Sequence, residues 1–178
     1  WMVPFDVHGL FDTLGGKATA TRRLDAFFHT PDGKWALTGA GPLHAELDNE
    51  PSVATPWLYD YAGQPWKTQE AVRIVANTIW KNAPDGIPGN DDLGEMSSWY
   101  VWAALGMYPE IPGRAELLLG SPLFPHAVVH GSGGDVIIDA PGASAQTPFV
   151  QSLTVDGKPH DAPWLTPALV AHGGTLRY

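Results

Sequence analysis

Two adjacent carboxylates, Asp91 and Asp92, lie in a glycine-bracketed loop just before an aromatic-rich segment. Turn residues between positions 84 and 89 end the preceding element, and the apolar pattern that restarts at Met96 predicts a helix beginning shortly after Asp92. An Asp before a helix can simply cap its free amides. A carboxylate held by such amides also stays ionised near neutral pH, which suits a general base that activates water or a ligand for a divalent cation. The spacing alone leaves capping and catalysis open.

A second polar group, Asp48-Asn49-Glu50-Pro51-Ser52, precedes another aromatic stretch. Asn and Glu supply the oxygen ligands that calcium takes, and the same atoms hydrogen-bond sugar hydroxyls. The alternative is a helix start that Asn49 or Ser52 caps. Aromatic side chains in and beyond this region offer flat faces for a sugar ring, although such residues more often form core: Trp57, Tyr59, Tyr61, Trp66, Trp99 and Trp102.

The composition excludes several classes of function. The net charge is −9 with only ten Lys and Arg residues, which argues against nucleic acid or an anionic membrane as a partner. No apolar run approaches the roughly 18 residues that a membrane span needs. The absence of cysteine rules out disulfides, thiolate metal sites and cysteine nucleophiles. No nucleophile-elbow, phosphate-loop or dinucleotide-binding pattern is present.

Hydrophobic periodicity predicts an α-rich part followed by a β-rich part, an α+β chain. Helices are expected within 5–29, broken at Gly15-Gly16, and then over 57–62, 66–80 and 94–107, with a long loop over 30–49. Short strands are expected over 117–119, 127–130, 136–139, 149–155 and 175–178, with a hairpin turn at Asp156-Gly157. The chain opens inside an apolar run, Trp1 to Phe5, so we expect it to be a fragment.

The ordered set of motifs resembles glycoside hydrolase family 92, whose members are calcium-dependent, exo-acting α-mannosidases that invert the anomeric centre. The resemblance covers essentially the whole chain. It implies the C-terminal part of an (α/α)6 barrel over residues 1–112 and a β-rich, sandwich-type segment over 113–178, after an N-terminal β-sandwich domain. The motifs are Val3 to Val7, Asn49-Glu50-Pro51-Ser52, Tyr61 to Gln69, Gly89 to Trp99, Leu105 to Pro109 and Gly120 to Phe124.

The resemblance also assigns roles. It implies that the carboxylate pair supplies the general base, with Asp92 the first choice and Asp91 the second. Asn49 and Glu50 would bind both mannose and calcium, and Asp6 and Trp99 would also contact substrate. In an inverting enzyme the base and the acid stand roughly 6.5–9.5 Å apart, with room for water. The family implies a mannose-containing glycan as partner and a secreted or periplasmic location.

The chain departs from the family in two respects. The family's general acid is a glutamate in a Glu-Gly-Asn-Ala-Trp-Gln-Tyr run just before the stretch that matches Trp1 to Pro4, so we expect the fragment alone to be inactive. Phe5 and Val53 stand where relatives often have His.

Two rival interpretations remain: a non-catalytic carbohydrate-binding or structural module in which the aspartates only cap a helix, and a helical-barrel glycosidase for another sugar.

Overall fold

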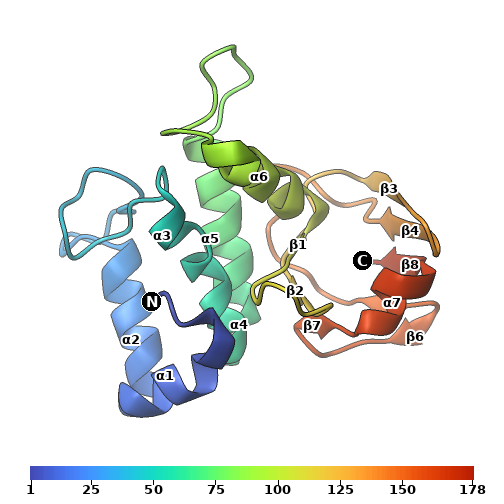
Figure 1. The fold of residues 1–178 in the computed structure, drawn as a ribbon, viewed down its shortest axis with the longest axis horizontal. Helices are drawn as coiled ribbons and strands as arrows, with labels where there is room; N and C mark the ends of the chain where they lie inside the picture. Colours follow the sequence, from blue (N-terminus) through green and yellow to red (C-terminus); the bar gives the residue numbers. More distant parts are fainter.

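The computed structural model describes the backbone of residues 1–178 and every side chain except that of Val170. Helices dominate up to residue 105: η1 Pro4–Asp6, α1 Val7–Thr13, α2 Lys17–Phe28, α3 Glu50–Val53, η2 Thr55–Trp57, α4 Leu58–Tyr61, α5 Pro65–Thr78, η3 Asp92–Gly94 and α6 Glu95–Leu105. Strands follow, with one further helix: β1 Met107–Tyr108, β2 Leu117–Leu119, β3 His126–Gly131, β4 Gly134–Asp139, β5 Thr154–Val155, β6 Lys158–Pro159, β7 Trp164–Leu165, α7 Pro167–His172 and β8 Gly174–Arg177. The mixed α and β class and its order along the chain agree with the sequence (Figure 1).

The strands form two small sheets. One has the order β1-β2-β7 and the other β3-β4-β8-β5-β6, and only the β4–β8 pair is parallel. The predicted hairpin turn is confirmed: Asp156 and Gly157 have φ of 50° and 76°, and Val155 pairs with Lys158. Two positive φ values in a two-residue loop match the twist of the flanking strands.

The expected strand over 149–155 is wrong for most of its length, because only Thr154 and Val155 form a strand there, β5. The preceding residues are held by a helix instead: the amide of Val150 donates to Oε1 of Gln69 on α5, at 3.0 Å. Helix α7 and strands β1 and β7 were not predicted. Each is short, and a two-residue strand carries no measurable periodicity.

Two hydrophobic cores meet at α6. Met96, Trp99 and Ala103 of α6 belong to the core of the helical part, whereas Trp102 and Leu105 pack against the core between the strands. In Figure 1, α6 accordingly runs from the helices toward the sheets. The helix ends at Gly106, whose left-handed conformation (φ 75°) turns the chain directly into β1.

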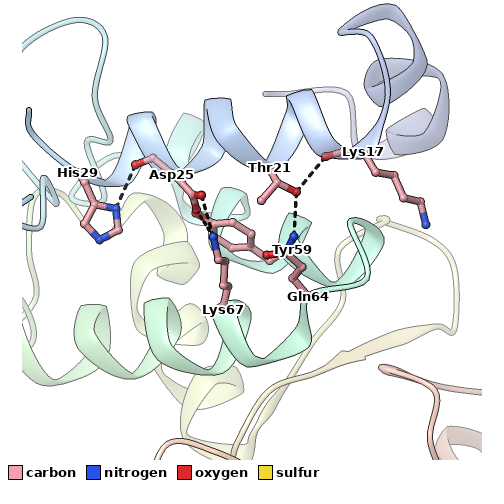
Figure 2. Close-up of polar contacts among 7 residues, drawn as sticks. All are labelled: Lys17, Thr21, Asp25, His29, Tyr59, Gln64 and Lys67. Atoms are coloured by element: carbon pink, nitrogen blue, oxygen red, sulfur yellow. Dashed lines mark hydrogen bonds and ion pairs between the residues drawn. The ribbon is translucent and has the colours of Figure 1, made fainter.

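A polar cluster joins α2, α4 and α5 (Figure 2). Lys67 Nζ lies 2.7 Å from both carboxylate oxygens of Asp25, and the Tyr59 hydroxyl donates to Asp25 Oδ1 at 2.9 Å. The ammonium also stands 5.6 Å from the centre of the Tyr59 ring. A charged group with several such partners fixes the three helices relative to one another.

Two acidic side chains are buried close to the helical core. Asp60 is 3% exposed and Glu110 6%, and neither Asp60 oxygen has a hydrogen-bond partner among the described residues. Burial raises the pKa of Asp60 well above its usual range. The nearby hydroxyl of Thr68 opposes this shift, and a negative charge on Glu110 would add to it. Burial likewise raises the pKa of Glu110. Both carboxyls are therefore stable as neutral acids in the folded chain.

This protonation makes folding stability depend on pH. The unfolded chain releases the Asp60 proton near pH 4, whereas the folded chain keeps it, so stability is lost as pH rises from there toward the raised pKa. We expect Asp60→Asn to remove this loss, which amounts to about 1.4 kcal/mol per pH unit for one proton. Urea unfolding at pH 5, 6, 7 and 8 measures the slope for both proteins. Equal slopes would contradict a neutral Asp60 in the fold.

Candidate active site

The structure separates the two adjacent aspartates. Asp91 Oδ1 accepts hydrogen bonds from the Ser97 amide at 2.8 Å and the Ser97 hydroxyl at 2.7 Å, while the Asp91 carbonyl accepts from the amide of Gly94 at 3.0 Å. Asp91 thus anchors the first turn of α6, as the capping interpretation expects. The Asp91 carboxylate is thus already used in holding the start of α6.

Asp92 points elsewhere because the backbone changes direction there. Asp92, Leu93 and Gly94 have φ of 42°, 61° and 92°, a run of left-handed residues. Non-glycine residues in this region cost about 1–2 kcal/mol each and persist only where the surroundings require them. The hydrogen bond from the Ser97 amide to Asp91 spans this turn. The Asp92 side chain remains exposed.

Asn49 and Glu50 begin α3 on the neighbouring segment. Asn49 occupies the N-cap position, but its side chain makes no capping hydrogen bond and stays exposed. The Ser52 hydroxyl oxygen accepts from the amide of Glu46 at 3.3 Å. Asn49 and Ser52 therefore do not cap α3 through their side chains, and the side-chain amide of Asn49 is open to a ligand.

The carboxyl groups of Glu50 and Asp92 lie together. A side-chain hydrogen bond to Asp92 raises the pKa of Glu50, and the negative charges of Asp92 and Glu95 add to that effect. Two carboxyls can share a hydrogen bond only when one of them holds a proton. The pair therefore favours a shared proton or a cation beside it. No sequence spacing links the two residues.

Trp99 holds these two segments in register. Its Nε1 donates to the carbonyl of Val53 at the end of α3, at 2.7 Å, and its ring stacks on Trp80 with centroids 4.8 Å apart. The side chain is 1% exposed. The hydrogen bond ties α6, which follows Asp92, to α3, which begins with Glu50.

Gly89 provides a second close contact between these two segments. It has φ of +62°, and a Cβ built there would lie 1.9 Å from the carbonyl oxygen of Asp48. Only glycine lets the loop before Asp92 pass this close to the backbone before Asn49.

Two of the predicted substrate-binding residues have structural partners of their own. Trp99 is a core residue and presents no face to a sugar. Asp6 caps α1, its Oδ1 accepting from the amide of Gly9 at 2.9 Å. The family resemblance implied both contacts, but an aromatic or an acidic side chain can also serve a structural role.

The described residues include no group of three or more His, Cys, Asp or Glu side chains that could bind a metal ion. None of the helices in the described part has the length and apolar character that a bilayer crossing requires. The arrangement is a solvent-facing carboxylate with a second carboxyl beside it. It can take a proton from water or help hold a cation.

Comparison with known proteins identifies relatives along the whole chain. The family model described as Glycosyl hydrolase family 92 catalytic domain matches residues 1–178. A family GH92 alpha-mannosidase from Bacteroides thetaiotaomicron is 33% identical, with a TM-score of 0.87 over 99% of this chain and 23% of its own. A family GH92 inverting mannosidase from the same organism is 32% identical, with a TM-score of 0.85 over 99% of this chain and 26% of its own.

A curated fungal relative, an uncharacterized secreted glycosidase from Arthroderma benhamiae, is 29% identical over 99% of this chain and 22% of its own length. The chain therefore spans about a quarter of the length of these relatives.

Proposed function

Because the chain belongs to glycosyl hydrolase family 92, we propose that it forms part of an inverting exo-α-mannosidase in which Asp92 is the general base. The pairing of Glu50 with an exposed Asp92 carries the proposal, since Asp91 is occupied by Ser97. Solved relatives named alpha-mannosidase and inverting mannosidase support the substrate and the stereochemistry.

In this proposal the reaction needs one base and one acid. Asp92 takes a proton from a water molecule, and the water oxygen bonds to the anomeric carbon from the face opposite the leaving group. The bond from that carbon to the glycosidic oxygen breaks, and an acid protonates the leaving oxygen. The resemblance places that acid, a glutamate, upstream of Trp1. Residues 1–178 would thus supply half of the catalytic pair and be inactive alone.

Calcium fits the chemistry of the residues beside Asp92. Glu50 faces another carboxyl, so its charge favours a cation there, and the exposed Asn49 adds an amide oxygen. Calcium takes about 6–8 oxygen ligands, so Glu50 and Asn49 would supply only part of its shell. When bound, the ion would hold sugar hydroxyls and favour the flattened ring of the transition state. Glu50 and Asn49 would orient the ion beside Asp92.

We extend the proposal to the architecture of the complete enzyme. Residues 1–112 would complete an (α/α)6 barrel and 113–178 would form its β-rich end, although the β1–β2 pair joins strands on both sides of that division. The relative named a secreted glycosidase supports action on glycans outside the cell.

Mannose release by the full-length protein tests this proposal. We expect it to hydrolyse an α-linked mannoside, to yield β-mannose first by NMR, and to lose activity in a calcium chelator with recovery on added calcium. α-Mannose as the first product would overturn inversion, and full activity in chelator would overturn the calcium assignment. Sugar binding without hydrolysis would favour a carbohydrate-binding module.

A further inference from the structure

A hollow of about 530 Å³ lies in the C-terminal part of the chain, and neither Glu50 nor Asp92 lines it. Its walls come from the irregular segment after β4, from Ser121-Pro122 and from the last residue, Tyr178. The volume falls in the range of about 300–1,000 Å³ that is typical of small-molecule sites.

The lining combines a largely apolar surface with a few neutral polar side chains. Phe149 is 49% exposed, and Gln146, Thr147, Gln151 and Ser152 line the same space. The Thr147 hydroxyl donates to the carbonyl of Gly142 at 2.8 Å, and Gln151 Nε2 donates to the carbonyl of Phe149 at 3.2 Å. No side chain of the lining carries a charge. A sugar ring presents an apolar face to an aromatic ring and hydroxyls to amides, which is the combination found here. An ionic ligand would find no counter-charge.

The walls are fixed from behind by one face of α5. Arg73, which is 5% exposed, donates through Nη2 to the Ser121 hydroxyl at 2.7 Å and to the carbonyls of Ser121 and Pro122 at 3.1 and 2.9 Å. Its Nη1 donates to the carbonyl of Ser144. A buried guanidinium surrounded by carbonyl oxygens holds two separate loops in one geometry.

Two neighbours of Arg73 on the same face extend this support. Asn77 Nδ2 donates to the Ala145 carbonyl at 3.0 Å, and Gln69 accepts from the Val150 amide at 3.0 Å. Residues four apart on a helix lie one above the other. Helix α5 therefore hydrogen-bonds the loop both before Gln146, at residues 144 and 145, and after Phe149, at Val150. A hollow with walls held in this way needs little ordering when a ligand enters.

We propose that this hollow is a second carbohydrate site, which takes one neutral hexose ring stacked on Phe149 and hydrogen-bonded by Gln146 and Gln151. It is separate from the Glu50–Asp92 pair and contributes no group to hydrolysis. On a glycan it would hold a sugar unit other than the one that is cleaved.

Sugar titration of the full-length protein by calorimetry tests the site, with methyl α-mannoside and methyl α-glucoside as neutral probes and galacturonate as a charged ring of similar size. All titrations use the Asp92→Asn background, so that no probe is consumed. We expect Phe149→Ala to weaken neutral-sugar binding at this site at least tenfold, which corresponds to about 1.4 kcal/mol. The matched control is Phe124→Ala, because Phe124 is 50% exposed and lies outside the lining.

Gln151→Ala provides a second variant that keeps the aromatic ring, and we expect at least a threefold loss. Unchanged binding in both Phe149→Ala and Gln151→Ala would overturn the proposal, as would equal binding of galacturonate. Sugar binding that only Glu50→Gln abolishes would also overturn the proposal, because that sugar would be bound at the Glu50–Asp92 pair. Hydrolysis of a simple mannoside, measured with Asp92 intact, should be unaffected by Phe149→Ala, so failure here is distinct from failure of the mannosidase proposal.

Discussion

Asp92→Asn in the full-length enzyme should lower kcat for an α-mannoside by about 10²–10⁴, with little change in KM. The amide cannot take the proton of the attacking water, and general base catalysis contributes roughly that factor. The substitution preserves size, and it leaves the backbone carbonyl of Asp92, which accepts from the amide of Glu95 at the start of α6, unchanged. Initial rates of mannose release against substrate concentration measure both constants.

Asp91→Asn is the matched control. Its Oδ1 accepts from the amide and the hydroxyl of Ser97, and an asparagine oxygen can accept both bonds. We expect this variant to keep kcat within about tenfold of the unmodified enzyme, which corresponds to a change of less than about 1.4 kcal/mol in the activation free energy. If Asp91→Asn lost more activity than Asp92→Asn, the base would have to be reassigned to Asp91.

Trp99→Ala should lower the free energy of unfolding by about 3–5 kcal/mol, which is the usual cost of removing a large aromatic side chain from a core. The indole is 1% exposed, stacks on Trp80 and donates to the Val53 carbonyl, so the change leaves a cavity and an unpaired buried carbonyl. Denaturant unfolding of the 178-residue chain measures the loss, which is a large part of the 5–15 kcal/mol typical of a domain.

Trp66→Ala serves as the comparison, since Trp66 is 51% exposed and should cost less than about 1 kcal/mol. A similar loss in both variants would show that Trp99 is no more important to the core than an exposed tryptophan. Trp99→Phe separates the two contributions, because it keeps a ring in the core but removes the donor to Val53. We expect it to fall between the unmodified chain and Trp99→Ala.

The helical elements could be predicted because their signals are local. The stripe of Val72, Val75 and Ala76 is buried on α5 as its spacing predicts. Asp156-Gly157 makes its hairpin because both residues tolerate positive φ. The segment over 149–153 could not be predicted, because the partner of Val150 is a side chain on a distant helix.

The candidate site also combines local features, which the sequence predicts, with contacts between distant segments, which it does not. The sequence alone determined which residue types were available: two aspartates before a helix, an Asn-Glu pair before another, and the order of motifs that resembles family 92. Only the tertiary structure decided which of these residues lie together and which of them pack or cap within the fold. It gave Asp91 to the α6 amides, paired Asp92 with Glu50, and placed Trp99 behind them in the core. The physical reason is distance along the chain: a cap or a turn forms between neighbours, whereas a carboxyl pair forms only once packing brings α3 and α6 together.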